Sequence, residues 1–278
     1  MTPYKPKVKA PDPKLVSHTT RILRSHGITT VCEESACPNR TECYSARTAT
    51  FMILGDTCTR ACRFCNVKTG RGVPPDPEEP QRIVRAVEAL GLDYVVITSV
   101  DRDDLPDLGA GHFCAVVEAL KCALPDVKVE LLTPDFKAQE ALLAQIVACG
   151  GDKLAHNEET VRRLSPTVRP QSDYDRSLEV LRYYATYFQN GRVKSSLMVG
   201  LGESIDELEE TMQELRDAGV EELTVGQYLQ PTPHHVPVAR YYDVLFFEKI
   251  KEIALRLGFK AVAAAPLVRS SYHAKALS

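Results

Sequence analysis

The sequence predicts an α/β fold in which parallel strands alternate with helices, either as a (β/α) barrel or as part of one. Two observations indicate this class. From residue 49 onward, short apolar runs rich in β-branched residues alternate with amphipathic runs of helical length, about six times in succession. The short runs are continuously apolar, which is typical of strands buried on both faces of a parallel sheet.

The strands are expected in order at TFMILGD (50–56), YVVITSV (94–100), KVELLTP (128–134), DKLAHN (152–157), VKSSLMVGL (193–201), ELTVGQYLQP (222–231) and KAVAAAP (260–266). The helices between them are expected at 78–91, 111–124, 138–150, 175–191, 204–219 and 242–258. The first of these helices begins with acidic residues and stops at Gly91. The fifth begins with a capping box of Ser204 and Glu207 and stops at Gly219. In such folds chemistry takes place in the loops that follow the strands.

Two extensions flank the repeat. We therefore expect an N-terminal extension at 1–48, the barrel at 49–266 and a C-terminal tail at 267–278. The beginning of the chain is rich in Pro and Lys, and residues 1 to about 30 are expected to form an extended, weakly structured arm.

Composition excludes several classes of function. The formal net charge of the 278 residues is −3 without a block of like charge, so we expect neither nucleic-acid binding nor an anionic membrane surface. No apolar run approaches the roughly 18 residues of a membrane helix, and the N-terminus lacks the apolar core of a signal peptide. A cytoplasmic protein is expected. In that reducing compartment nine cysteines, an odd number, are more often ligands or catalytic groups than disulfides.

Three cysteines follow the first predicted strand in the segment CTRACRFC, and we call Cys58, Cys62 and Cys65 the loop triad. A structural zinc site has four ligands, usually in pairs. Three thiolates spaced C-x3-C-x2-C with no nearby fourth suit a 4Fe-4S cluster with one iron open to a small molecule. A zinc knuckle, or thiols without a ligand, is the alternative.

The loop triad, with Phe64 before its last cysteine and a position after the first barrel strand, resembles the motif of the radical S-adenosylmethionine (SAM) superfamily. The resemblance implies that the open iron binds the amino and carboxylate groups of SAM. It also implies that the reduced cluster cleaves SAM to methionine and a 5′-deoxyadenosyl radical.

A second set of cysteines lies ahead of the barrel in the segment CEESACPNRTEC, and we call Cys32, Cys37 and Cys43 the N-terminal triad. Their spacing is C-x4-C-x5-C, which again leaves a ligand set incomplete. This indicates a second cluster whose fourth ligand is labile or comes from elsewhere in the chain. A zinc loop completed by a distant histidine is the alternative.

Both triads together resemble the lipoyl synthases, and the likeness spans essentially the whole chain. It includes the segments TSVDRDDLPDLGA (98–110), PDFK (134–137), HNEETVRRL (156–164), MVGLGE (198–203), QYLQPTPHHVPV (227–238) and VRSSYHA (268–274). The resemblance implies a partial (β/α)6 radical SAM barrel. It also implies that the N-terminal triad and one serine of the tail hold an auxiliary 4Fe-4S cluster; Ser271 is favoured over Ser270, although nothing in the sequence separates them.

This resemblance implies the insertion of two sulfur atoms, at carbons 6 and 8 of an octanoyl chain on a carrier lysine, with the auxiliary cluster as sulfur donor. Those C–H bonds are unactivated, so no side-chain acid, base or nucleophile breaks them, and a cofactor must supply a radical. The implied partners are octanoylated lipoyl domains, namely the glycine cleavage H protein and the acyltransferase subunits of 2-oxoacid dehydrogenases. A ferredoxin or flavodoxin is the implied electron donor.

Other polar residues at the strand ends are candidates for cofactor contacts. We expect some of them to contact SAM or the carrier. The candidates are Asp101 with its neighbours Arg102, Asp103 and Asp104, then Asn157, Glu203 and, in the tail, Arg269. For each, a structural role is the alternative: a solvated loop, a turn into the next helix or a surface salt bridge. His156 is expected to be structural, and His234 and His235 to belong to a surface loop. Cys114, Cys122 and Cys149 are expected to be core or surface thiols.

Three other functions remain open on the sequence alone. A methylthiotransferase also carries two clusters, but it would be expected to bring an RNA- or protein-binding accessory domain, and no basic extra domain is present. A non-catalytic iron–sulfur electron carrier, or a zinc-stabilised binding module, has no need of a barrel of this length.

Overall fold

The computed structural model describes residues 12–272 and 274–277, which divide into two compact units. The N-terminal unit comprises residues 12–60 and 66–153. The C-terminal unit comprises residues 61–65, 154–272 and 274–277. The chain thus changes unit on either side of a five-residue segment that contains Cys62 and Cys65.

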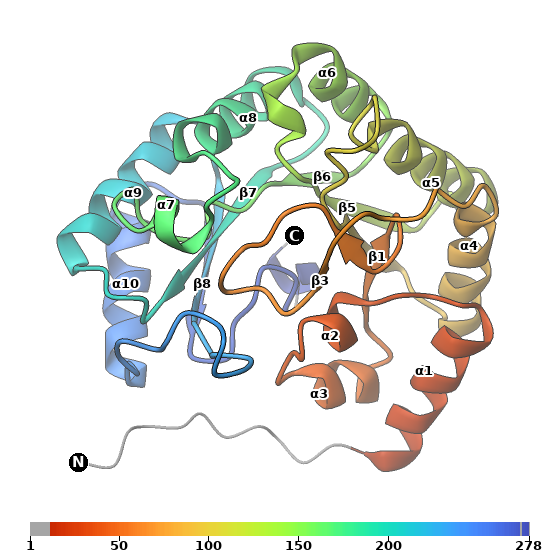
Figure 1. Ribbon diagram of the computed structural model, residues 1–278, viewed down its shortest axis with the longest axis horizontal. Coiled ribbons are helices and arrows are strands. Elements are labelled where there is room, and N and C mark those ends of the chain that lie inside the picture. Colours follow the sequence, from red (N-terminus) through yellow and green to blue (C-terminus); the bar gives the residue numbers. More distant parts are fainter. Residues whose placement is uncertain (1–11, 273, 278) are drawn as a thin grey trace. The chain divides into compact units, whose positions relative to one another are not determined.

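Seven strands form a parallel sheet whose order is β1-β4-β5-β6-β7-β8-β9 (Figure 1). Their bounds are β1 (Thr50–Ile53), β4 (Tyr94–Ser99), β5 (Lys128–Leu132), β6 (Lys153–Ala155), β7 (Val193–Val199), β8 (Glu222–Gln227) and β9 (Ala261–Ala265). Each lies within a range predicted from the sequence. The apolar side chains of β1 are all buried, as expected for a strand covered on both faces.

A helix follows each of the first six strands, which confirms the predicted α/β class. These helices are α4 (Glu79–Leu90), α5 (Ala110–Ala123), α6 (Glu140–Ala148), α8 (Tyr174–Tyr187), α9 (Ile205–Asp217) and α10 (Val244–Arg256). The predicted end signals are present: α4 is capped by Gly91 in the left-handed conformation, and α9 begins with the capping box of Ser204 and Glu207.

Within each unit the helices cover one face of the strands. In the N-terminal unit α4 packs against α5, and α5 packs against α6. In the C-terminal unit α8 packs on β7, and α10 packs on β8 and β9 (Figure 1). This leaves the strand ends and the loops after them to carry functional groups.

The predicted extended arm is wrong for residues 13–25, which form helix α1 (Pro13–Ser25). The Asp12 carboxylate accepts hydrogen bonds from the backbone of the first turn, and a proline occupies the first helical position. Thr19 donates to the Tyr44 carbonyl at 2.8 Å, and Leu23 is buried, so the helix is fixed by packing. The Pro- and Lys-rich composition concealed this start signal. Residues 1–11 lie outside the described part of the chain.

Several short elements were not predicted. They are α2 (Val31–Glu34), α3 (Arg40–Ser45), β2 (Thr57–Cys58), β3 (Lys68–Thr69), α7 (Ser165–Val168) and the 3₁₀ turns η1 (Phe136–Ala138) and η2 (Ala274–Leu277). Each is too short to show a hydrophobic period. Two of them, α2 and α3, carry Cys32 and Cys43.

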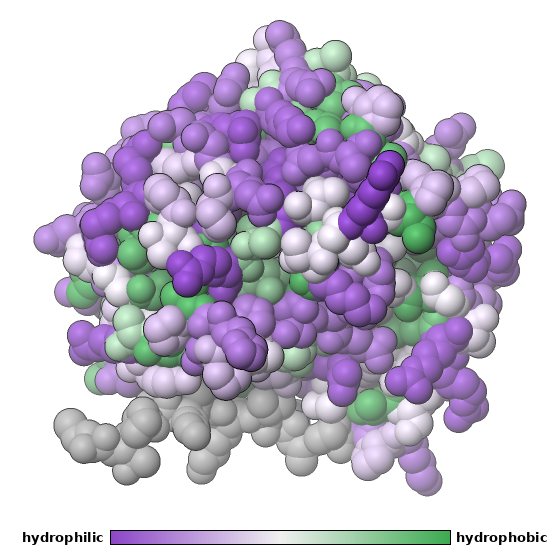
Figure 2. Space-filling view, in the orientation of Figure 1, coloured by the Kyte–Doolittle hydropathy of each residue, from purple (hydrophilic) through white to green (hydrophobic). Residues whose placement is uncertain are grey.

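The face shown in Figure 2 is covered mostly by hydrophilic side chains, with small hydrophobic areas between them. Among the described residues, none of the helices has the length and apolar character that crossing a membrane would demand.

Candidate functional site

The loop triad begins at the end of β2, where Cys58 is half-buried. Its thiol lies 3.8 Å from Asp101 Oδ2, and the backbone amide of Arg60 donates to its sulfur at 3.4 Å. The hydroxyl and amide of Thr59 both donate to the Asp101 carbonyl at 3.0 Å. The first half of the loop is therefore tied to the segment that follows β4.

A buried arginine inside the motif holds this half of the loop. The guanidinium of Arg60, 5% exposed, forms two hydrogen bonds with Asp103 (2.7 and 3.0 Å) and two with Asp135 (both 2.8 Å). Asp101 lies 3.4 Å away, and the side chain of Asp135 is completely buried. Hydrogen bonding from Arg60 lowers the pKa of Asp103, although burial opposes the shift. Sequence reasoning missed both Arg60 and Asp135 as functional positions.

The charge run after β4 is structural rather than a solvated loop. Arg102 is 2% exposed, pairs with the Asp104 carboxylate at 2.8 and 3.0 Å, and donates to the Leu54 carbonyl at 3.2 Å. Asp103 belongs to the Arg60 cluster. Asp101 faces both Cys58 and Arg60, so it is the member of this run that lies beside the loop triad. Its predicted role as a cofactor contact stays a prediction.

The second half of the loop, residues 61–65, is seated within the C-terminal unit. The backbone amide of Arg63 donates to the Val168 carbonyl at 2.8 Å, and its carbonyl accepts from Val236 at 3.0 Å. The ring of Phe64 packs against a buried cluster of Val168, Leu201 and Tyr228. Phe64 therefore anchors the loop through packing. The outcome for the histidines is mixed: His234 is exposed, as predicted, whereas His235 is half-buried beside Cys65.

The N-terminal triad is carried by α2, α3 and the turn between them. Cys32 is buried, and Cys37 and Cys43 are half-buried. Burial, followed by the neighbouring Cys37, raises the pKa of Cys32 to about 11. Burial, followed by Cys32 and Cys37, raises the pKa of Cys43 to about 12. A neighbouring cysteine of the triad disfavours the thiolate form of each of these two residues, so the three side chains lie in one neighbourhood, and a bound cluster would displace their protons. This donor set fits an iron–sulfur cluster.

All nine cysteines are in the described part of the chain, and they are present as thiols. Within that part, no three His, Cys, Asp or Glu side chains meet at the spacing that a single metal ion requires. Cys114 donates to the Gln145 carbonyl at 3.7 Å, Cys149 is half-buried and Cys122 is exposed, as expected for core or surface thiols.

The tail that carries the two serines follows β9 in the C-terminal unit. Val268 donates to the Ala265 carbonyl and Tyr272 to the Arg269 carbonyl, both at 3.0 Å, and Arg269 Nη1 donates to the Val268 carbonyl at 2.6 Å. Ser270 and Ser271 are both half-buried. His273, quoted above in the segment VRSSYHA, lies outside the described residues. Ser271 as a ligand and Arg269 as a cofactor contact stay predictions.

Gly226 in β8 is needed for the path of this tail. A Cβ at that position would overlap the Val268 carbonyl oxygen and lie 3.1 Å from Arg269 Nη1. We expect Gly226→Ala to displace the tail and to lower the free energy of unfolding by about 1–3 kcal/mol, the usual cost of overpacking. The measurements are thermal unfolding and tryptic cleavage after Arg269, which should be faster in the variant. Unchanged melting and cleavage would contradict this account.

Asn157 and Glu203 lie after β6 and β7. Asn157 Nδ2 donates to Glu159 at 2.9 Å, but its Oδ1 atom is buried without a partner among the described residues. Since buried polar atoms are normally paired, this acceptor atom is suited to a hydrogen-bond donor on a bound ligand. The Glu203 carboxylate accepts from the amides of Gly200 and Leu201 at 2.6 and 2.9 Å, so it holds the turn after β7. His156 is buried and bonds to Ser177 at 3.1 Å, which is a structural role, as predicted.

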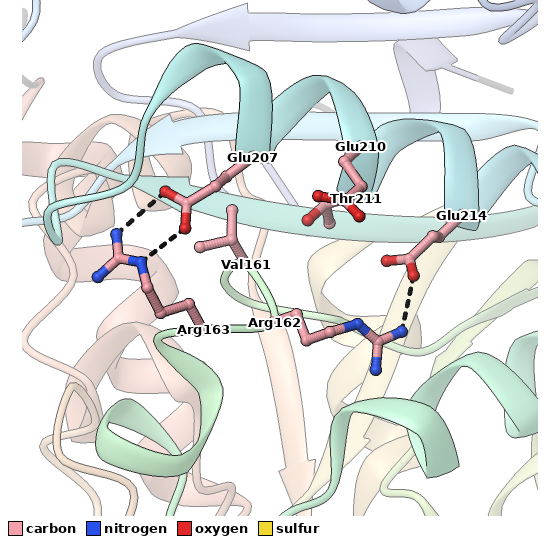
Figure 3. Close-up of a pocket in the computed structure, with 7 residues that line it drawn as sticks. All are labelled: Val161, Arg162, Arg163, Glu207, Glu210, Thr211 and Glu214. Carbon is pink, nitrogen blue, oxygen red and sulfur yellow. Dashed lines mark hydrogen bonds and ion pairs between the residues drawn. The ribbon is translucent and has the colours of Figure 1, made fainter.

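One pocket of the C-terminal unit lies between the segment 161–163 and α9, with a volume of about 230 Å³ (Figure 3). Arg163 is paired with Glu207 at 2.6 and 3.0 Å, and Arg162 with Glu214 at 2.6 Å. None of the predicted site residues lines this pocket, and its arginines are already neutralised. Its lining therefore gives no link to either cysteine triad.

Comparison with known proteins gives a consistent result. A model of the radical SAM superfamily matches residues 52–215. A lipoyl synthase of Haemophilus influenzae is 51% identical over 253 residues, which cover 91% of this chain and 79% of that protein. Lipoyl synthases of Methylococcus capsulatus and Rubrobacter xylanophilus are 51% and 49% identical, each over 96% of this chain and 84% of their own length.

Among solved structures, methylornithine synthase superposes with a TM-score of 0.56 at 13% identity, covering 94% of this chain and 87% of its own. Streptococcus suis SuiB bound to the precursor peptide SuiA gives a TM-score of 0.58 at 13% identity, covering 95% and 58%. At these identities the likeness concerns the fold alone, and it confirms the predicted partial radical SAM barrel.

Proposed function

The chain belongs to the lipoyl synthase family of the radical SAM superfamily, and we propose that its two cysteine triads hold two 4Fe-4S clusters with different tasks. The activity is the SAM-dependent insertion of two sulfur atoms, at carbons 6 and 8 of a protein-bound octanoyl-lysine. The cofactors are SAM and the two clusters. The loop triad is assigned to the cluster that acts on SAM, and the N-terminal triad to the auxiliary cluster that donates sulfur.

The observation that carries this proposal is the presence of two cysteine triads in one chain. The N-terminal triad is carried by α2, α3 and the turn between them, and the loop triad lies in the loop after β1. When bound at the loop triad, a reduced cluster would supply an electron to SAM and so a radical strong enough to break an unactivated C–H bond. The protein's own part is positioning. Arg60 fixes the first half of the loop, backbone hydrogen bonds fix the second half, and Glu203 holds the turn after β7.

Contacts to SAM are proposed for Asn157, Asp101 and Glu203. Asn157 is best supported, because its buried Oδ1 has an unused acceptor position at the C-terminal end of β6. A contact to Glu203 would have to share a carboxylate already bonded to two amides. Arg269 and Phe64 are proposed to lie beside the cofactors, with Phe64 acting through the packing of its ring.

We propose Ser271 as the fourth ligand of the auxiliary cluster. An alkoxide is a harder donor than a thiolate and can be protonated and lost, which would let an iron leave as sulfur is removed. The three-part division at 1–48, 49–266 and 267–278 belongs to the same proposal, since it assigns the two auxiliary ligand segments to the two extensions. Ser270, its neighbour, provides the matched control.

The substrates are octanoylated carrier domains. More specifically, we propose the glycine cleavage H protein and the lipoyl domains of 2-oxoacid dehydrogenase acyltransferases, with a ferredoxin or flavodoxin as electron donor and the cytoplasm as the compartment.

The test is anaerobic preparation of the protein, a count of iron and sulfide, and incubation with dithionite, SAM and an octanoyl-lysine peptide. About eight irons per chain, release of 5′-deoxyadenosine and a product that gains two sulfurs are expected. Ser271→Ala should lose the sulfur product, whereas Ser270→Ala should retain it. Bound zinc, or no nucleoside release by the wild type, would contradict the function; equal loss in both serine variants would contradict only the ligand assignment.

A further inference from the structure

We propose that His235 is a positioning residue that fixes the backbone at Cys65, the last cysteine of the loop triad, and thereby the cluster held there. The inference rests on the proposed function only in taking Cys65 as a cluster ligand. Sequence patterns assigned His235 to a surface loop, so the structure adds a role that the motif did not reveal.

Both nitrogens of the His235 ring are engaged. Nε2 lies 3.0 Å from the Cys65 carbonyl oxygen, and Nδ1 lies 2.9 Å from the Thr232 hydroxyl. A carbonyl oxygen can only accept, so Nε2 carries the hydrogen. In the neutral ring Nδ1 then accepts from Thr232. The ring is thus held in one orientation and one tautomer, and its Nε2–H group points to the Cys65 carbonyl of the loop triad.

The segment that carries His235 grips the loop at a second point. The amide of Val236 donates to the Arg63 carbonyl at 3.0 Å, two residues before Cys65. The segment is itself braced: Tyr228 donates to the Val236 carbonyl at 2.7 Å, and Gln230 donates to the His235 carbonyl at 2.9 Å. Residues 228–236 are therefore hydrogen-bonded to one another and to residues 63 and 65, all within the C-terminal unit.

The adjacent histidine lacks these contacts. His234 is exposed, and among the residues that the structure describes its only bond runs from its backbone amide to the Thr232 hydroxyl at 3.3 Å. Two neighbouring histidines with opposite environments indicate that the contact to Cys65 depends on His235 alone. Partners that hold a ligand in place, without touching the metal, commonly change metal affinity by about 10–100-fold.

The test uses the full-length holoprotein and four variants. In Gln the amide nitrogen occupies nearly the place of His Nε2, so His235→Gln keeps the donor to Cys65. In Asn it occupies nearly the place of Nδ1, so His235→Asn loses that donor but stays polar. His235→Ala removes both contacts, and His234→Ala is the matched control.

The readout is the rate at which an iron chelator, under anaerobic conditions, abolishes the electron paramagnetic resonance signal that responds to SAM. The signal is recorded after reduction with dithionite, because the oxidised cluster is diamagnetic. We expect the Asn and Ala variants to lose this signal about tenfold faster than the wild type. His235→Gln and His234→Ala should stay within about twofold of it. If His235→Ala does not fold, the Gln and Asn pair decides.

Equal lifetimes in all variants would overturn the positioning role. If the signal were lost as fast in His235→Gln as in His235→Asn, the hydrogen bond to Cys65 would not be the cause of the positioning effect. The readout involves neither the octanoyl substrate nor the sulfur product, so a wrong substrate assignment leaves it intact. A wild type without any SAM-responsive signal would overturn the inference and the proposed function together.

Discussion

Replacing all three cysteines of the N-terminal triad by alanine is expected to abolish the sulfur product while SAM cleavage continues. The triad is formed by α2, α3 and the intervening turn, whereas Cys58 is fixed by Asp101 and the backbone of Arg60. The two sites therefore draw on different ligands. The iron content should fall from about eight to about four per chain. The measurements are iron analysis, 5′-deoxyadenosine release and mass spectrometry of the peptide product.

The matched control replaces the loop triad by alanine. That protein should also retain about four irons, but it should release no 5′-deoxyadenosine and hence form no product. The two triple variants are thus expected to have the same iron content and opposite responses to SAM. Sulfur insertion by the first variant, or SAM cleavage by the second, would contradict the division of tasks.

Arg60→Met is expected to lower the free energy of unfolding by about 3–5 kcal/mol, since it removes the guanidinium from the buried carboxylate of Asp135. Asp135 is completely buried and would lose both of its hydrogen bonds to the guanidinium. Methionine keeps most of the volume, so the effect reports charge rather than a cavity. Equilibrium denaturation of the apoprotein measures it.

The control is Arg163→Met, which removes an equally well-formed pair with Glu207 from an exposed position (Figure 3). Screening by solvent makes such exposed ion pairs weak, so little change in the free energy of unfolding is expected. Comparable destabilisation by both variants would contradict the argument from burial.

The Arg60 effect should depend on pH. Arg60 holds the pKa of Asp103 below its ordinary value of about 3.9, so the stabilisation is present above that pH and is lost as the pH falls through the lowered value. The difference in the free energy of unfolding between the wild type and Arg60→Met should therefore be largest near neutral pH and should decrease in acid. If this difference in the free energy of unfolding increased below about pH 4, the ion-pair explanation would be contradicted.

Much of the fold could be predicted because its signals are local. Continuous apolar runs marked the strands, and Gly91 and the capping box at Ser204 marked helix ends. Helix α1 was missed because its start signal at Asp12 lies in a Pro- and Lys-rich stretch. Helices α2 and α3 span four and six residues, which is too short for a 3.6-residue period to appear.

The site divides in the same way. Cysteine spacing is a local pattern and was readable, but its supports are not local. Arg60 and Asp135 are 75 residues apart, and His235 and Cys65 are 170 apart. Only the folded chain brings such pairs together. Glu203 differs from these pairs, because its contacts to Gly200 and Leu201 are local, and its role as a cofactor contact stays a prediction.

The two arginines of the segment CTRACRFC engage the protein by different means. Arg60 acts through its guanidinium, whereas Arg63 acts through its amide and carbonyl and has an exposed side chain. The contacts therefore depend on the identity of the side chain at position 60, but only on the backbone at position 63. Among descendants of this gene, arginine should persist at 60, while position 63 should drift through nearly every amino acid except proline, which has no amide hydrogen to give.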